Sequence, residues 1–218
     1  MDAPKGARLK RCDFPITLAI ALAAIATTAF AFAVPGVHDA LVADDRAFAG
    51  EGWRLVTAPL VHATWGHLVR DLALVALAGV AYEAVLPRAV FGLGLVVPTI
   101  AVLVEHRVAW YCGLSGLSHA LLAAALAYEA LRRRRAWVYA LCAVAIAKPI
   151  YEVVTGAPAF PMELGAHVVQ TPVAHAAGVV VGIISGARAG RAPSSSPASA
   201  RRSGPRPSRA AESRGDRA

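Results

Sequence analysis

Long apolar blocks alternate with short polar segments along most of the chain, and the blocks show no amphipathic period. They cover residues 16–34, 66–86, 89–105, 113–131, 136–154 and 172–187. Each block approaches the ~20 residues that a helix needs to cross a ~30 Å hydrocarbon layer. The pattern therefore predicts an all-α membrane protein whose domain, residues 15–187, is a bundle of six transmembrane helices.

Basic residues mark one side of the predicted bundle. The first block follows a basic N-terminus, as in a signal peptide, but it lacks a small-residue cleavage site, so we interpret it as a retained helix. With residues 1–14 in the cytoplasm, the inner segments hold 17 of the 22 Lys and Arg residues. This positive-inside bias predicts a multi-pass protein of a bacterial inner membrane with both termini in the cytoplasm.

The C-terminal segment 188–218 is rich in Ser, Pro, Ala, Gly and Arg. Such a segment cannot bury a core, so we predict a disordered, basic cytoplasmic tail that contacts anionic lipid. Because eight arginines lie in this tail, the net charge of +8 does not indicate nucleic acid as a partner. The three cysteines lack metal-ligand spacing and predict no disulfide framework.

Several polar residues interrupt the apolar blocks, where such groups are energetically expensive. They are Arg70, Asp71, Glu83, Ser115, His119, Lys148, Glu152 and His175. Measured from the basic inner ends at about 1.5 Å per residue, Ser115 lies roughly 24 Å and His175 roughly 18 Å along its helix. Both side chains therefore reach the outer half of the bilayer at a similar depth.

Glycines supply a way for Ser115 and His175 to meet. Gly178, Gly182 and Gly186 form a small-residue stripe that permits close helix packing. If this stripe packs on the block that contains Ser115, the imidazole reaches the hydroxyl and the two form a catalytic dyad. Taken singly, each feature also has an ordinary structural role, because serines bond their own backbone and glycine stripes merely pack. Their common depth favours the dyad.

At these residues the chain resembles the rhomboid family of intramembrane serine proteases. The family's GxSG element is present at residues 113–116, and its AHxxGxxxG element at residues 174–182. A Trp-Arg pair, two histidines and a glutamate precede them at matching spacing, as Trp53, Arg54, His62, His67 and Glu83. The ordered set is far more specific than an isolated GxSG.

The resemblance implies a serine endopeptidase that cuts membrane-anchored proteins in or near a transmembrane segment. Ser115 would be the nucleophile and His175 the general base, without an acidic third member. The Ser115 N–H and His67 would line the oxyanion hole. The other residues lining the site would be His62, Asp71, Gly113 and His119. No metal, nucleotide or other cofactor is implied.

Asp71 departs from the family pattern, which has asparagine at this position. An ionised carboxylate would repel the developing oxyanion. Burial could keep the carboxyl protonated and make it a donor, or Arg70 or His67 could pair with it. We prefer the pairing, because His67 lies one helical turn away on the same face.

A second difference concerns residue 119, where many rhomboids carry tyrosine and this chain has histidine. Together with the short chain and the AKPIYE stretch at 147–152, His119 resembles rhombosortase, a bacterial branch thought to process proteins with C-terminal Gly-Gly sorting tails. An ordinary rhomboid remains an alternative. For His119 itself, stacking on His175 is an equally good role.

The last two polar residues receive a structural interpretation. Lys148 and Glu152 are four residues apart, so they can neutralise each other on one helix face. The outer loop 156–171 corresponds to the region that gates the site in rhomboids.

Two other function classes compete with a protease. One is a non-catalytic rhomboid relative that binds the transmembrane segments of client proteins, and Asp71 is its only support. The other is a small transporter, which would carry charges across the full membrane depth, whereas most of the polar residues here lie in the outer half. No HExxH sequence occurs, which disfavours an intramembrane metalloprotease.

Overall fold

The computed structural model describes residues 14–159 and 171–192, and this part of the chain is helical without strands. The long helices are α1 (Pro15–Ala33), α4 (Trp65–Tyr82), α5 (Ala89–Glu105), α6 (Ser115–Arg133), α7 (Ala136–Thr155) and α8 (Pro172–Arg191). Short helices fill the segment between α1 and α4: α2 (Val37–Leu41), η1 (Asp45–Ala47), α3 (Arg54–Thr57) and η2 (Ala58–Leu60). The ends of the long helices all lie within four residues of the ends of the predicted apolar blocks.

Local sequence explains where several helices begin and end. Proline occupies the first turn of α1 and α8, where its missing N–H costs nothing. The Thr64 hydroxyl accepts a hydrogen bond from the His67 N–H and caps α4. Gly156 ends α7 in the left-handed conformation that favours glycine.

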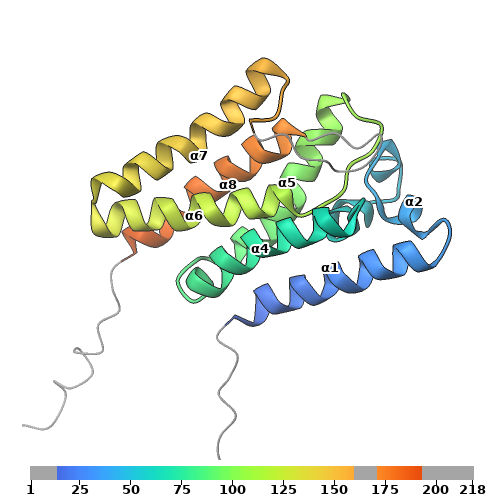
Figure 1. Ribbon diagram of the computed structural model, residues 1–218, viewed down its shortest axis with the longest axis horizontal. Coiled ribbons are helices and arrows are strands. Elements are labelled where there is room, and N and C mark those ends of the chain that lie inside the picture. The colour runs from blue at the N-terminus through green and yellow to red at the C-terminus, as the bar shows by residue number, and fades with distance from the viewer. Residues whose placement is uncertain (1–13, 160–170, 193–218) are drawn as a thin grey trace, which may run out of the picture.

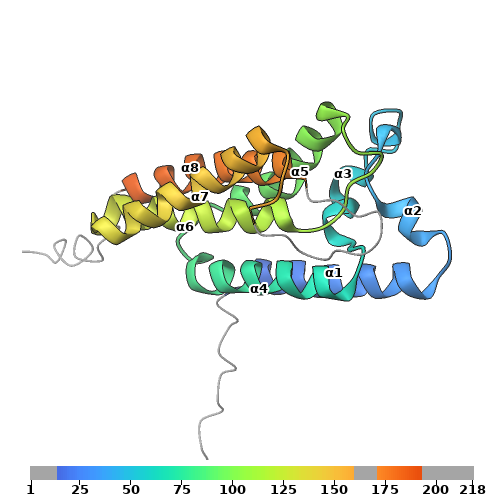
Figure 2. The same cartoon turned by 45° about the horizontal axis from the view of Figure 1, so that its top comes forward.

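The helices form two groups (Figures 1 and 2). Helices α1 and α4 lie side by side, while α6, α7 and α8 form the second group, with α5 against α6 and α8. The main core lies where α4, α5 and α6 meet, around the buried side chains Leu68, Val75, Phe91, Leu117 and Leu121. The α2–α3 region closes one end of the bundle, beside the starts of α4 and α6.

Helices α6 and α8 pack with their backbones in direct contact. A methyl group on Gly178 would overlap the Gly116 carbonyl oxygen, and one on Gly182 would overlap the Ala120 carbonyl oxygen. Gly186 lies equally tight against Ala124. The predicted packing of the glycine stripe is therefore confirmed, with glycine required because only its missing Cβ lets the two backbones touch.

Arg54 organises the segment between α1 and α4. Its guanidinium is 2% exposed and donates to the carbonyl oxygens of Asp39 at 2.6 Å and Val42 at 2.7 Å. It also pairs with the Glu51 carboxylate. One buried cation thus satisfies backbone acceptors that would otherwise be buried without donors.

Within residues 14–159 and 171–192, three helices, α1, α7 and α8, are long and apolar enough to cross a membrane, and α5 is a shorter apolar helix. Large apolar side chains also face outward, with Leu77 69% exposed on α4 and Val154 78% exposed on α7. Such surfaces suit lipid rather than water. The count of six spans stays a prediction, because α4 and α6 carry the polar residues of the site.

One predicted boundary is wrong. The tail was expected from residue 188, but α8 continues to Arg191, since Ala and Arg are good helix formers. The rest of the predicted tail, the N-terminal residues before Phe14 and most of the loop 156–171 lie outside the described residues.

Candidate active site

Ser115 lies at the start of α6, directly after a tight turn. Gly113 has a φ of +103°, and its backbone N–H donates to the Ala58 carbonyl at 3.1 Å. A Cβ at this glycine would lie 2.7 Å from the His67 Nε2 atom. Both the turn and the close approach of His67 therefore require glycine two residues before Ser115.

The α6 N-terminus also brings hydrogen-bond donors to this position. Among the described residues, the Ser115 N–H donates no hydrogen bond, as expected in the first turn of a helix. The buried Tyr111 hydroxyl lies beside the start of α6 and donates to the Gly113 carbonyl at 3.2 Å. Burial raises the Tyr111 pKa, so the hydroxyl keeps its proton.

His175 lies on α8 at the level of the α6 start, and it is 5% exposed. Its ring stacks on His119 of α6, with centroids 4.1 Å apart and an interplanar angle of 16°. The His119 Nδ1 atom lies 2.7 Å from the Ser115 carbonyl oxygen. The stacking proposed for His119 is confirmed. Because His119 contacts both the His175 ring and the Ser115 carbonyl oxygen, it links His175 to Ser115. No direct Ser115–His175 hydrogen bond is present between the described residues.

The other side of His175 faces a carboxylate. The Nδ1 atom of His175 lies 2.8 Å from the Glu152 Oε2 atom on α7. Lys148 lies 2.9 Å from Glu152 Oε1, 3.2 Å from His119 Nε2 and 3.3 Å from His175 Nδ1. The predicted Lys148–Glu152 pair therefore exists, but its interpretation as a purely local pair was incomplete.

A second polar cluster lies beside Gly113. Asp71 Oδ2 is 3.3 Å from the Nε2 atoms of both His67 and His62. The preferred partner of Asp71, His67, therefore lies beside it, but Asp71 Oδ2 makes no hydrogen bond within the described part of the chain. Burial lowers the His62 pKa, so this imidazole is neutral and its Nε2 accepts the Leu114 N–H at 3.3 Å. These contacts pack the turn before Ser115 against the start of α4.

This second cluster is also the group among the described residues with metal-ligand chemistry. The candidate ligand atoms of His62, His67 and Asp71 all lie within 4.8 Å of one another, and two imidazoles with one carboxylate suit zinc or iron. However, the lone pair of His62 Nε2 already accepts a backbone N–H. Burial raises the Cys112 pKa to about 12, so its neighbouring thiol is no ready fourth ligand.

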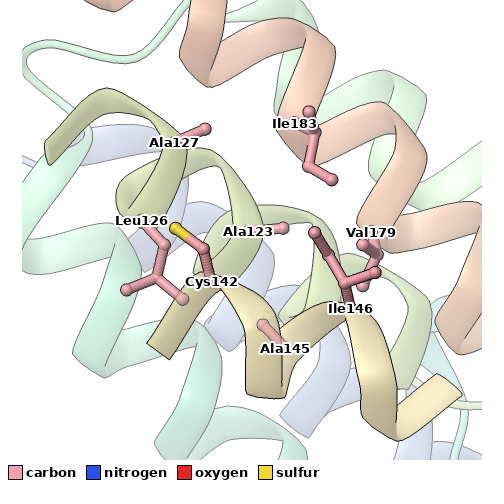
Figure 3. A pocket seen from close by; sticks show the side chains of 8 residues that line it. All are labelled: Ala123, Leu126, Ala127, Cys142, Ala145, Ile146, Val179 and Ile183. Atoms are coloured by element: carbon pink, nitrogen blue, oxygen red, sulfur yellow. The ribbon is translucent and has the colours of Figure 1, made fainter. Parts of the chain in front are cut away.

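A small apolar pocket lies elsewhere, between α6, α7 and α8 (Figure 3). Its lining residues are Ala123, Leu126, Ala127, Cys142, Ala145, Ile146, Val179 and Ile183. The pocket is about two turns along α6 from Ser115 and offers no charged or strongly polar group. It is therefore separate from the candidate active site.

All seven residues predicted for the site lie in these two clusters. His119 and His175 belong to the first with Ser115, and His62, His67 and Asp71 to the second with Gly113. Sequence reasoning missed Tyr111 altogether, and it named Glu152 only as the partner of Lys148 and not as a neighbour of His175. The depth argument could have found Glu152, which lies 17 residues, roughly 25 Å, from the basic inner end of α7.

Comparison with known proteins gives one family. The family model described as the Rhomboid domain matches residues 49–192, about two thirds of the chain and every residue of both clusters. No curated protein matches the chain.

Proposed function

The chain belongs to the rhomboid family, and on this basis we propose that it is an intramembrane serine endopeptidase with Ser115 as nucleophile and His175 as general base. Rhomboid proteins are generally proteases that act on membrane proteins in a bilayer. The residue roles and the substrate class are the proposal.

The single observation that carries it is the contact between α6 and α8. Glycines remove the side chains between the two backbones, so His175 lies at the level of Ser115 and stacks on the residue one turn further along α6. A substrate that draws the Ser115 hydroxyl toward the imidazole would complete the hydrogen bond, because catalytic hydrogen bonds often tighten only in the substrate complex.

The chemistry proceeds in two transfers. The Ser115 Oγ atom bonds to the scissile carbonyl carbon while the hydroxyl proton moves to His175, and the proton then passes to the leaving amine as the C–N bond breaks. Water next attacks the acyl-enzyme with the imidazole again accepting a proton, which releases the new carboxyl end and restores the hydroxyl.

The oxyanion would form at the α6 N-terminus. The Ser115 N–H is free to donate there, and the helix dipole favours negative charge at this end. His67 packs against Gly113 and can supply a second donor. Asp71 Oδ2 lies 3.3 Å from the His67 Nε2 atom, and an N–H on that nitrogen would offset part of the repulsion between the carboxylate and the oxyanion.

Substrates and location form the finer part of the proposal. We place the protein in a bacterial inner membrane with six spans and with the active site in the outer half of the bilayer. The histidine at position 119, stacked on His175, supports the rhombosortase-like branch, with C-terminal Gly-Gly tailed proteins as substrates.

The test compares wild type with Ser115→Ala in membranes that contain a single-span reporter with a Gly-Gly tail. Ser118→Ala is a matched control, since Ser118 is a buried serine one turn further that bonds the Leu114 carbonyl. Wild type and Ser118→Ala should cleave the reporter, while Ser115→Ala should lose at least about 1,000-fold in rate. Equal cleavage by Ser115→Ala would remove Ser115 from the mechanism.

If the tailed reporter stays intact with wild type, single-span reporters without the tail distinguish the substrate class from the activity. Cleavage of those reporters alone would indicate an ordinary rhomboid. No cleavage of either, together with binding of the intact reporter, would support the non-catalytic relative.

A further inference from the structure

We propose that Glu152 is a positioning residue for His175, so that this chain works with a Ser115–His175–Glu152 arrangement in place of a dyad. The inference rests on the proposed function of Ser115 and His175. Its observation is the 2.8 Å contact between Glu152 Oε2 and His175 Nδ1.

The hydrogen-bond network assigns the proton on His175. Two bare acceptors facing each other at 2.8 Å would repel, so Nδ1 carries a hydrogen and donates it to Glu152. Nε2 is then left without a hydrogen. This is the tautomer that a general base needs on its reactive nitrogen.

The neighbouring groups agree with this assignment. His119 Nδ1 lies 2.7 Å from the Ser115 carbonyl and must donate to it, which leaves His119 Nε2 to accept from Lys148 at 3.2 Å. The remaining ammonium hydrogens of Lys148 point to Glu152. The Lys148 Nζ atom also lies 3.3 Å from His175 Nδ1. This nitrogen carries its own hydrogen, so it cannot accept one from Lys148.

Burial and charge explain why this contact matters. Glu152 is 1% exposed, and the Ala159 N–H holds its second oxygen at 3.1 Å. When His175 takes the Ser115 proton it becomes cationic in a site shared with the Lys148 ammonium. The buried carboxylate offsets the added positive charge and keeps the ring oriented.

The competing interpretation is that Glu152 only neutralises Lys148. The two interpretations differ in which partner matters. If Glu152 only neutralises Lys148, removing the carboxylate and removing the ammonium should lower activity equally. If it serves His175, removing the carboxylate harms catalysis much more than removing the ammonium.

The experiment uses the full chain in detergent with a fluorophosphonate probe and a cleavable single-span reporter. The probe reports on the dyad alone: a bond forms from Ser115 Oγ to phosphorus, fluoride leaves and the hydroxyl proton passes to His175. The variants are Glu152→Gln, Lys148→Gln and, as a matched control, Glu83→Gln, which changes a buried glutamate far from the site. Rates are normalised to sites labelled at completion, so a misfolded fraction does not enter.

Glu152→Gln should lower kcat and the labelling rate by about 100- to 10,000-fold with KM unchanged, the loss that follows removal of a triad carboxylate. Lys148→Gln should lose less than about tenfold, and Glu83→Gln should match wild type per labelled site. Equal losses in Glu152→Gln and Lys148→Gln, or a change confined to KM, would overturn the inference while leaving the dyad intact. Wild type that is neither labelled nor active would overturn the proposed function and the inference with it.

Discussion

Two buried glutamates at opposite ends of the bundle have the same side chain but different partners. Glu83 follows α4 and is 8% exposed, and Glu152 on α7 is 1% exposed. Glu83 accepts hydrogen bonds from the Ile16 N–H at 2.7 Å and from the Thr17 N–H and hydroxyl at 2.8 and 2.6 Å. Glu152 binds Lys148 and His175, which can both carry a proton.

The partners decide what each carboxylate does. Glu83 caps the N-terminus of α1, where no local side chain does so, and its charge complements the helix dipole. Its donors never change protonation in the working range, so it acts on stability. In the proposed mechanism, Glu152 bonds a group that gains a proton in every catalytic cycle, so we expect it to act on chemistry. Burial alone does not distinguish the two roles.

The largest effect is expected when the packing of α6 on α8, which holds His175 beside Glu152, is disrupted while the surroundings of Glu83 are left intact. Gly182→Val places a branched side chain against the Ala120 carbonyl and the Ala123 Cβ, so α6 and α8 must separate. We expect the free energy of unfolding to fall by at least about 1–3 kcal/mol and reporter cleavage to be lost. Thermal unfolding in detergent and a cleavage assay measure both.

Gly92→Val is the control, because a side chain at Gly92 meets nothing within 4 Å. It should keep both stability and activity. A Gly182→Val protein as active as Gly92→Val would show that the close α6–α8 contact is dispensable.

The next effect separates stability from chemistry at Glu83. Glu83→Gln should lower the free energy of unfolding by about 1–3 kcal/mol, because the amide cannot satisfy three donors as a carboxylate does. Thermal unfolding should show this loss while activity per folded molecule stays within about twofold of wild type. A fall in kcat without a stability loss would contradict the comparison.

Asp71 provides a third carboxylate, between the two extremes. Asp71→Asn removes a negative charge near the proposed oxyanion site and keeps a side chain of the same size beside His67, so cleavage should stay the same or increase. A loss of about 100-fold, the cost of one oxyanion donor, would show that the carboxyl itself is needed. Reporter cleavage by this variant beside wild type measures the difference.

The smallest effect expected is that of a metal chelator. Because His62 Nε2 accepts a backbone N–H, its lone pair is not available to a metal ion. We therefore expect the cluster of His62, His67 and Asp71 to act without a metal. Incubation with EDTA, followed by the cleavage assay, should leave the rate unchanged. A loss restored by zinc would assign a metal to His62, His67 and Asp71.

Much of the fold could be predicted from sequence. Long apolar runs can satisfy their backbone in lipid only as helices, so the blocks and the observed helices nearly coincide. The packing role of the glycine stripe on α8 could be predicted because a missing Cβ has direct steric consequences. The end of α8 was misplaced, since basic residues mark the membrane boundary but do not end a helix.

The site was predictable only in part. Spacing and depth pointed to Ser115 and His175 as a pair, because both lie on helices whose direction and inner end could be predicted from the basic residues. The choice among partners for Asp71 required the fold, which brings His62 from the preceding loop as well as His67 from the same helix.

The sequence by itself determined the helices, their apolar surfaces and the residues proposed to perform acyl transfer, because these depend on local composition and regular spacing. Only the tertiary structure decided the partner of Glu152. Its nearest cation along the helix is Lys148, but the packing of α7 on α8 adds an imidazole from 23 residues further along the chain. Side chains on different helices meet according to how whole helix faces pack, and no short-range pattern contains that information.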